Sequence, residues 1–388
     1  MGILQQSFSW MRTYWSALPP IYRKIAVGAG IYVGLTSLMT WSVGVVFNNS
    51  LWCSPKLRQR RQFNGNTYAI VTGANGGIGK EIAKQLMLDG CNVVVACRNQ
   101  QKAEAVIREL TAISQQRKEK APTAKHGKLV FIKLDLASKQ SVDEFIEKFL
   151  SLKVECNILI HNAAITTSKP NPFCEQDNMN VMWQCNHLSQ FYLTLALLPH
   201  IVHATNKHQF GRIVNLNSIF HRDGRAADIE YFMDDARRND RSYLDANVNT
   251  TGVGLYNSTK LANVLFVHKL HEYVQSNFPH VMPYLCVCCV HPGIVDTPLL
   301  MQTRLISHPL LYTQWRCFCL LSAEQGAIQV LHTVHCDMDN AKYLANGKYH
   351  TNGAYVAYTE KTKALIQAYA DKLWNKSLEI WPIDMDTR

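Results

Sequence analysis

A glycine-rich turn between an apolar run and an amphipathic segment constrains the fold of this chain more than any other feature. Tyr68–Thr72 has the apolar content of a buried strand, and Lys80–Leu88 carries apolar residues at helical spacing. Asp89-Gly90 ends this predicted helix, and Asn92–Ala96 supplies a second apolar strand. The order strand, turn, helix, strand is that of a βαβ unit, whose turn amides and helix N-terminus can bind a dinucleotide pyrophosphate.

The residue after the second strand bears on the choice of cofactor. The turn residues expected to surround that cofactor are Gly73, Asn75, Gly76, Gly77, Ile78 and Gly79. Arg98 stands where an Asp or Glu would bind the ribose hydroxyls of NAD, and no acidic residue lies between Ala96 and Ala103. An Arg can pair with the 2′-phosphate of NADP, so the sequence favours NADP(H). The alternative interpretation of Arg98 is a solvated loop residue.

Further apolar runs predict more strands, at Leu129–Leu134, Asn157–His161, Arg212–Leu216 and Tyr284–Val290. The intervals between them are long enough for crossover helices. This alternation predicts an α/β fold with a Rossmann-type doubly wound parallel sheet. We expect a single catalytic domain over residues 67–388, with its substrate-binding region at about 294–345.

An uncharged segment precedes the predicted domain. The 23 residues Ile25–Phe47 would extend about 34 Å as a helix, enough to cross a hydrocarbon core of about 30 Å. We therefore expect a transmembrane anchor between a flank at 1–24 and a basic linker at 48–66, in preference to a cleaved signal or a buried core helix. The flanking basic residues lean weakly towards a cytosolic domain, and we expect a single-pass protein of the endoplasmic reticulum membrane.

The net charge of +11 is compatible with an anionic cofactor, an anionic membrane surface or nucleic acid. The basic residues are scattered apart from Arg58–Arg61, and no zinc-finger spacing or aromatic RNA-binding signature occurs, so we expect no nucleic-acid partner. Cys286, Cys288 and Cys289 lie in an apolar run and predict buried thiols in a reducing compartment. The cysteines at 286–289 and 317–319 lack the matching second pair of a structural zinc site, so we expect no metal.

A Tyr and a Lys four residues apart form a candidate proton-transfer pair. Tyr256 and Lys260 open a predicted helix and lie on one of its faces. A nearby ammonium favours the phenolate, which would lower the pKa of Tyr256 towards the range where it exchanges a proton with a carbinol or carbonyl oxygen. In a chain with 16 Tyr, about one such pair arises by chance, so this pair alone identifies no site.

The ordered set of motifs resembles the classical short-chain dehydrogenase/reductase family over roughly Thr67–Glu379. Thr72–Gly79 matches the cofactor turn of that family. The other matches, in chain order, are the adenine-side pair Asp135-Leu136, the strand end Asn162-Ala163-Ala164, the tetrad Asn186, Ser218, Tyr256 and Lys260, and the nicotinamide loop Pro292-Gly293 with Thr297.

The resemblance implies a role for each member of the tetrad. Tyr256 would be the general acid/base, and Ser218 would hydrogen-bond the substrate oxygen. Lys260 would hold the nicotinamide ribose and lower the pKa of Tyr256, while Asn186 would support a water on a proton relay.

The strand end Ala96-Cys97-Arg98, the membrane anchor and the tail from Ser322–Gly326 to Gly347–Tyr349 look most like retinol dehydrogenases. The similar X-linked dehydrogenase/reductase type has an ending comparable to Leu373–Ser377. These resemblances imply an apolar retinoid-like, polyprenoid or steroid alcohol and its carbonyl as substrates.

Some features depart from the family pattern or leave alternatives open. Ala164 replaces the usual Gly and His161 the preceding Asn. The insert at 222–253 predicts a substrate lid, a partner surface or a solvated loop. The apolar segment Pro309–Leu321 predicts a bilayer-facing substrate entrance or a core helix. The main alternative function is a membrane-tethered, NADP-binding scaffold or redox sensor without turnover. The oligomeric state stays open, with a dimer as one option.

Overall fold

The computed structural model describes residues 60–166, 173–174, 176–238, 253–301, 320–336, 349–351, 354–356 and 358–383. The expected anchor at Ile25–Phe47, its flanks up to residue 59 and the apolar segment 302–319 lie outside these residues. Within the described parts of the chain, no helix has the length and apolar content needed to cross a bilayer.

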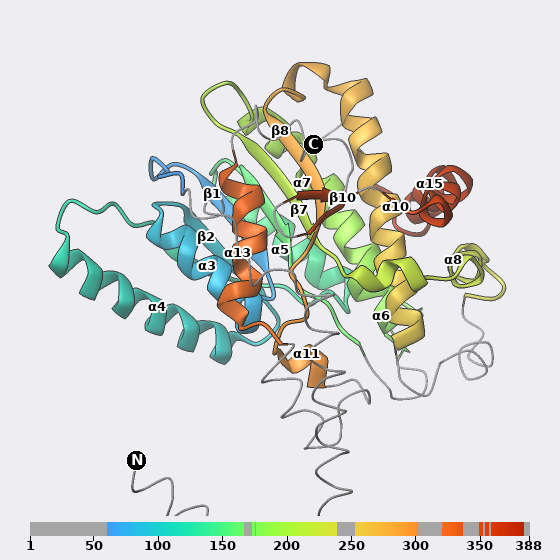
Figure 1. Ribbon diagram of the computed structural model, residues 1–388, viewed down its shortest axis with the longest axis horizontal. Helices are drawn as coiled ribbons and strands as arrows, with labels where there is room; N and C mark the ends of the chain where they lie inside the picture. The colour runs from blue at the N-terminus through green and yellow to red at the C-terminus, as the bar shows by residue number, and fades with distance from the viewer. Residues whose placement is uncertain are drawn as a thin grey trace, which may run out of the picture. The chain divides into compact units, whose positions relative to one another are not determined.

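The central sheet has the strand order β10-β9-β8-β7-β4-β1-β2-β3 (Figure 1). Its strands are β1 (Tyr68–Thr72), β2 (Asn92–Cys97), β3 (Leu129–Lys133), β4 (Ile158–His161), β7 (Gly211–Leu216), β8 (Leu285–His291), β9 (Tyr349–Thr351) and β10 (Ala354–Val356). Neighbouring strands are parallel except β9 and β10. Since β1 pairs with both β2 and β4, the winding reverses there, and the predicted doubly wound sheet is confirmed.

Helices cover both faces of the sheet (Figure 1). One face packs against α3 (Gly77–Leu88), α4 (Gln100–Lys120) and α13 (Ala323–His335), and the other against α5 (Lys139–Ser151), α7 (Ser189–Ala204) and α10 (Val253–Asn277). The shorter elements are the hairpin β5 (Phe173–Cys174) and β6 (Met179–Asn180), α6 (Val181–Trp183), the π-helical turn η3 (Gln184–Leu188), the 3₁₀ helices η4 (Ile219–Asp223) and η5 (Pro279–Val281), α8 (Ala226–Met233) and α11 (Pro298–Met301).

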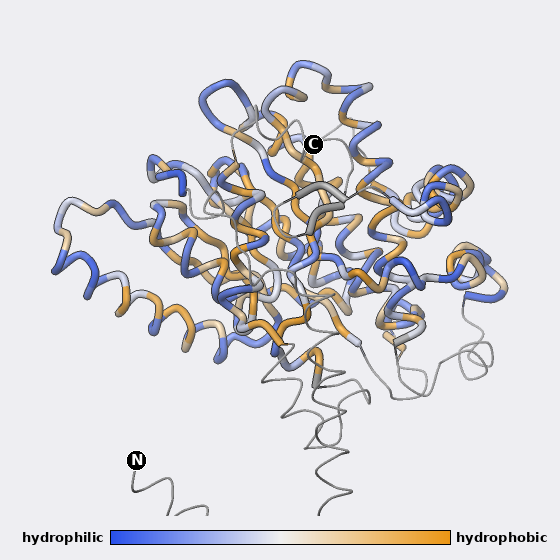
Figure 2. The backbone as a smooth tube through the Cα atoms, in the orientation of Figure 1, coloured by the Kyte–Doolittle hydropathy of each residue, from blue (hydrophilic) through white to orange (hydrophobic). Residues whose placement is uncertain are grey.

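Two hydrophobic cores form because successive strand residues point to opposite faces of a sheet. In β1, Ile70 packs in one core and Val71 in the other, and Val94 and Val95 divide in the same way in β2. Figure 2 shows the hydrophobic residues concentrated in these central strands. Burial on both faces explains why the strands are continuous apolar runs in the sequence. The thiols predicted to be buried in β8 are fully buried.

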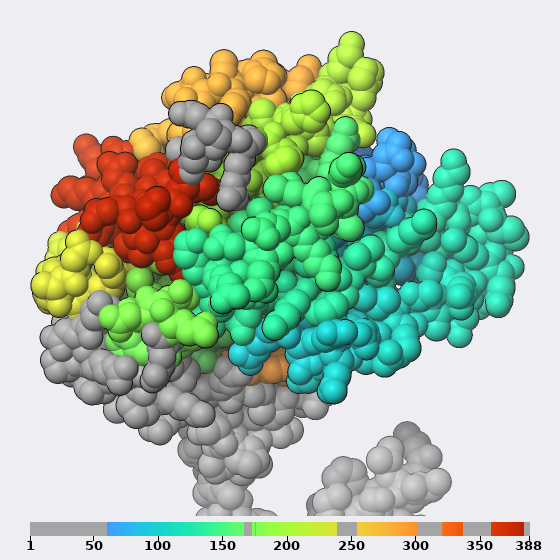
Figure 3. All heavy atoms as spheres, turned by 180° about the vertical axis from the view of Figure 1, so that it is seen from behind, coloured from blue at the N-terminus to red at the C-terminus, as the bar shows by residue number. Residues whose placement is uncertain are grey.

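The C-terminal helix α15 (Glu360–Ile380) packs on the outer sides of α7 and α10. The ring of Trp374 lies 5.2 Å from that of Phe191 in α7 and 6.1 Å from that of Phe266 in α10, measured between centroids. Helix α8 lies beside α15 in Figure 1 and Figure 3, and Tyr369 of α15 donates a hydrogen bond to Glu230 of α8. The described part of the insert is therefore attached to the body of the domain.

Candidate active site

The glycine turn after β1 needs residues without side chains at specific positions. Gly73 and Gly77 have φ values of 68° and 52°, in the left-handed region that favours glycine. A Cβ on Gly79 would lie 2.4 Å from Asn162 Nδ2 and 2.6 Å from the Gly73 carbonyl oxygen. A Cβ on Gly76 would meet no atom within 4 Å. The turn is therefore closed towards β4 and open on the side where Gly76 lies.

Hydrogen bonds join the ends of β1 and β4 beneath this turn. Asn162 Nδ2 donates to the Thr72 carbonyl oxygen at 2.8 Å. The backbone amides of Asn162 and Ala163 both donate to Thr72 Oγ1 at 3.0 Å. The predicted cofactor residues Asn162 and Ala163 thus fix the position of the turn.

The other predicted cofactor residues lie at the same C-terminal edge of the sheet. Arg98 is exposed directly after β2 and lines an open hollow with Asn99, Gln100, Gln101 and Glu104. After β3, the Leu136 carbonyl oxygen accepts a hydrogen bond from Ser189 Oγ at 2.6 Å, and Asp135 Oδ1 accepts one from the Ala137 amide at 3.0 Å. Thr297 follows the Pro292-Gly293 loop and places its Cγ2 3.5 Å from the Cβ position of Gly77.

These residues form a cradle that fits a dinucleotide. The turn is open at Gly76, helix α3 begins directly after it, Arg98 follows β2, and Thr297 lies against Gly77. Gly73, Gly76, Gly77 and the α3 N-terminus would hold the pyrophosphate.

Three of the four tetrad residues meet at the C-terminal end of β7. Ser218 follows β7, and its side chain lies close enough to that of Tyr256 on α10 to lower the pKa of the phenol. Lys260, one turn along α10, donates from Nζ to the Leu216 carbonyl oxygen at 2.7 Å. Its Nζ lies 5.7 Å from the centre of the Tyr256 ring. Phenol, hydroxyl and ammonium therefore share one site.

The pKa values in this site differ from the sequence-based expectation. Burial raises the pKa of Tyr256 well above its ordinary value, and the Ser218 side chain offsets only part of that rise. Burial lowers the pKa of Lys260 to about 8. The expected lowering of the Tyr256 pKa by Lys260 is therefore not seen in this structure, because the loss of water around the phenol dominates.

The contacts of Asn186 join two parts of the site. It lies in the π-helical turn η3, and its side chain accepts from the Ile165 amide and donates to the Ile165 carbonyl oxygen, both at 2.8 Å. Its Nδ2 also approaches Thr259 Oγ1 at 3.1 Å. The Asn186 carbonyl oxygen accepts from Asn263 Nδ2 at 2.8 Å. Asn186 thus links the loop after β4 to helix α10.

Two of the residues that shape the site were missed in the sequence. Asn263 stands seven residues after Tyr256, so a polar residue on the same buried face of α10 was the available signal. His221 donates from Nδ1 to the Ser218 carbonyl oxygen at 2.8 Å, and its amide donates to the same oxygen at 3.1 Å. His221 therefore anchors the backbone that carries the Ser218 hydroxyl.

His161, a departure from the family pattern, is a core residue. Its Nε2 lies 2.7 Å from Thr194 Oγ1, which itself donates to the Gln190 carbonyl oxygen at 2.7 Å. The ring nitrogen must therefore be the donor to Thr194. Burial, with a smaller contribution from the charge of Lys260, lowers the pKa of His161 to about 3, so the imidazole is neutral.

Comparisons with known proteins agree with this geometry. Residues 67–232 match the family described as short chain dehydrogenase. Retinol dehydrogenase 12 of Mus musculus is 30% identical over 320 residues, covering 82% of this chain and 87% of that protein. Dehydrogenase/reductase SDR family member 13 of Homo sapiens is 30% identical over 335 residues, covering 84% and 74%. An uncharacterised Mycobacterium paratuberculosis protein has a similar fold, with a TM-score of 0.57 at 24% identity over 84% of this chain and 96% of that one.

The close approach at Gly79 leads to a stability prediction. Gly79→Ala should lower the free energy of unfolding by about 2 kcal/mol, because the new methyl group would overlap backbone that cannot move away easily. The measurement is urea unfolding without added nucleotide. Gly76→Ala is the matched control and should change stability by less than about 0.5 kcal/mol. Equal losses in the two variants would contradict the packing described.

Proposed function

Because this chain belongs to the short-chain dehydrogenase family, we propose that it is an NADP(H)-dependent oxidoreductase that interconverts an apolar alcohol and its aldehyde or ketone. The observation that carries this proposal is the convergence of Ser218, Tyr256 and Lys260 at the sheet edge that also carries the glycine turn. The family and the fold support a nicotinamide nucleotide and alcohol–carbonyl oxidoreduction.

Tyr256 is the proton donor in the proposed reduction. The ordinary pKa of a tyrosine already lies well above 7 and that of Tyr256 is raised further, so the phenol is protonated at neutral pH and can give a proton to the carbonyl oxygen. The Ser218 hydroxyl would hydrogen-bond the same oxygen, and Lys260 supplies a positive charge close to the phenol. When bound, the nicotinamide supplies the hydride chemistry. Alcohol oxidation needs the phenolate, so it should gain from rising pH, whereas reduction loses activity only above the pKa of Tyr256.

The proposed preference for NADP(H) depends on Arg98. The guanidinium is exposed at the end of β2, within the hollow beside Asn99 and Gln100. A guanidinium at this position can form a charge-assisted, bidentate pair with a 2′-phosphate.

The proposed substrate and location follow from the sequence and the relatives. The name of retinol dehydrogenase 12 supports a retinoid-like substrate, with polyprenoid or steroid compounds of similar polarity as further candidates. The apolar segment Pro309–Leu321 supports entry of such a compound from a bilayer. We place the chain in the endoplasmic reticulum membrane through a single anchor at Ile25–Phe47, with the catalytic domain facing the cytosol.

Turnover provides the central test. Detergent-solubilised full chain should consume NADPH with at least one of all-trans-retinal, a steroid ketone and a short polyprenal. Tyr256→Phe should lower kcat about 100- to 10,000-fold, because the proton donor is lost, while NADPH still binds. Tyr284→Phe, at the opposite end of β8, is the control and should retain full activity. NADPH binding without consumption by the unaltered chain would favour the scaffold without turnover.

A charge reversal tests the cofactor preference. Arg98→Glu should lower kcat/KM for NADPH by about 10- to 100-fold and leave kcat/KM for NADH equal or higher, because the charged hydrogen bonds to the 2′-phosphate are lost. Lys102→Glu is the control: it changes the net charge equally at a nearby exposed position. A similar loss of kcat/KM for NADPH in both variants would contradict a specific contact with Arg98 and indicate a general electrostatic effect.

Membrane attachment is testable in the full chain. Leu35→Arg combined with Leu38→Arg should move the protein from the membrane pellet to the supernatant after alkaline carbonate extraction, because each central charge costs about 2.5–3.5 kcal/mol in insertion. Leu35→Ile with Leu38→Ile should remain in the pellet. Retention of the Arg variant in the pellet would contradict the anchor.

A further inference from the structure

A buried carboxylate connects the insert to the catalytic helix. Asp228 lies on α8 with no exposed surface. Its Oδ2 accepts hydrogen bonds from Ser258 Oγ at 2.5 Å and from Arg225 Nε at 2.9 Å, and its Oδ1 accepts from Arg225 Nη2 at 2.7 Å. Arg225 thus makes a two-point contact with the carboxylate, and Ser258 donates a further hydrogen bond to it.

Ser258 is well placed to transmit this contact. It lies between Tyr256 and Lys260 in the first turns of α10 and is fully buried. Its hydroxyl donates to Asp228 and also accepts from the Arg225 amide at 3.1 Å. One side chain therefore ties the turn that carries Tyr256 to two residues at the start of α8.

The backbone before α8 also lies directly against α10. A Cβ on Gly224 would be 2.6 Å from Leu261 Cβ and 3.1 Å from the Asn257 carbonyl oxygen. The two segments are in contact on both sides of Ser258 along the helix.

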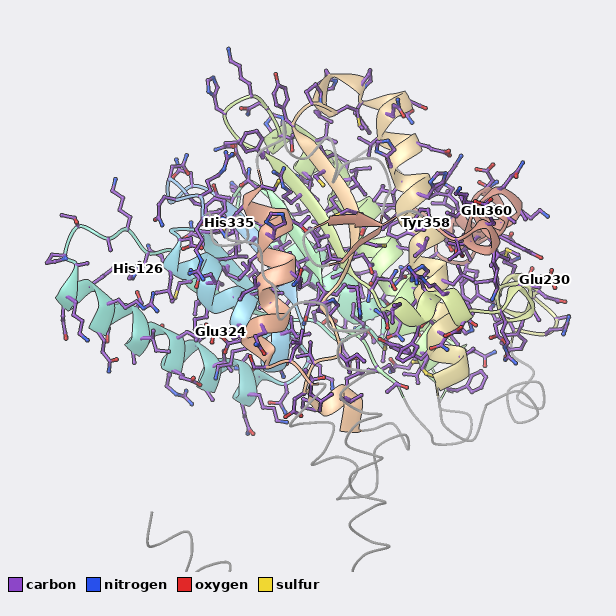
Figure 4. All side chains as sticks on the ribbon, in the orientation of Figure 1. His126, Glu230, Glu324, His335, Tyr358 and Glu360 are labelled. Carbon is purple, nitrogen blue, oxygen red and sulfur yellow. The ribbon has the colours of Figure 1, made fainter. Side chains whose placement is uncertain are left out.

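The same short helix contacts the turn that carries Asn186. Phe232 at the end of α8 stacks on Trp183, with ring centres 4.6 Å apart and an interplanar angle of 22°. Trp183 directly precedes η3. On its other side, α8 contacts α15: Glu230 of α8, labelled in Figure 4, accepts a hydrogen bond from Tyr369 of α15. Helix α8 thus contacts α10, which carries Tyr256 and Lys260, and the residue that leads into the turn of Asn186.

A helix that only filled space here would not need a buried charge. Burying a carboxylate is unfavourable unless it is paired and hydrogen-bonded, and apolar residues commonly replace such pairs without loss of stability. Hydrogen bonds, unlike apolar contacts, fix direction as well as distance. The hydrogen bond from Ser258 to Asp228 therefore suits a helix turn whose orientation must be fixed.

We propose that Asp228 is a positioning residue, which acts through Ser258 to hold the first turn of α10 so that the Tyr256 phenol faces the Ser218 hydroxyl. This inference rests on the proposed oxidoreductase function. It assigns a role to the start of the insert. The sequence predicts this insert to be a substrate lid, a partner surface or a solvated loop.

The test uses Ser258→Ala and Asp228→Asn in the full chain. Each variant should lower kcat about 10- to 100-fold, while KM for the carbonyl and Kd for NADPH stay within about twofold, because neither residue is placed at the substrate or the cofactor. With NADPH deuterated at the transferred position, the isotope effect on kcat should rise, because the chemical step becomes slower. A loss of folded protein would lower kcat without changing that isotope effect.

Controls separate this role from simple stabilisation. Asp223→Asn, at an exposed position just before α8, should leave kcat and the isotope effect unchanged. The double variant Ser258→Ala with Asp228→Asn should be no slower than Asp228→Asn alone, because both substitutions remove the same hydrogen bond. Ser258→Ala removes one hydroxyl and no charge, so it keeps the test valid if Asp228→Asn fails to fold. An unchanged kcat, or a lower kcat with an unchanged isotope effect, would overturn the proposal.

A failure of the proposed function gives a different result. If the unaltered chain turns over no carbonyl, hydrogen exchange of the backbone amides in residues 254–260 still tests the contact. Faster exchange confined to that turn in Ser258→Ala would support the positioning role, and unchanged exchange would overturn it.

Discussion

The contact between the ends of β1 and β4 is the constraint on which the site depends. Thr72 receives hydrogen bonds from Asn162 and Ala163, and the Asn162 side chain fills the space that any side chain on Gly79 would need. This contact sets where helix α3 begins and which side of the turn stays open. Because β1 is also the strand at which winding reverses, the crevice forms beside it.

The catalytic end depends on helix α10, which is fixed by polar contacts inside an apolar core. Lys260 binds a carbonyl oxygen of β7, Asn263 binds the turn that carries Asn186, and Ser258 binds the carboxylate of Asp228. Lys260 and Asn263, three residues apart, lie on one face of the helix, and Ser258 lies on another. The removal of water that accompanies this packing explains why the pKa of Tyr256 is raised.

Two departures from the family pattern, His161 and the insert, are accommodated by contacts with neighbouring residues. His161 is neutral and hydrogen-bonded to Thr194, so its ring replaces a polar strand residue without adding a charge near Lys260. The described start of the insert between Ser218 and Tyr256 forms α8, which contacts α15. These features belong to the frame that supports the site.

The sequence by itself determined where six of the parallel strands lie along the chain, the glycine turn, and the presence of Ser218, Tyr256 and Lys260 in one site. It could do so because strand burial, turn geometry and helical spacing are local patterns that leave direct traces in residue order. Only the tertiary structure decided the contacts of Asn186, the anchoring of Ser218 by His221 and the raised pKa of Tyr256. Those properties arise from burial and from partners distant in the chain, and neither is encoded in local spacing.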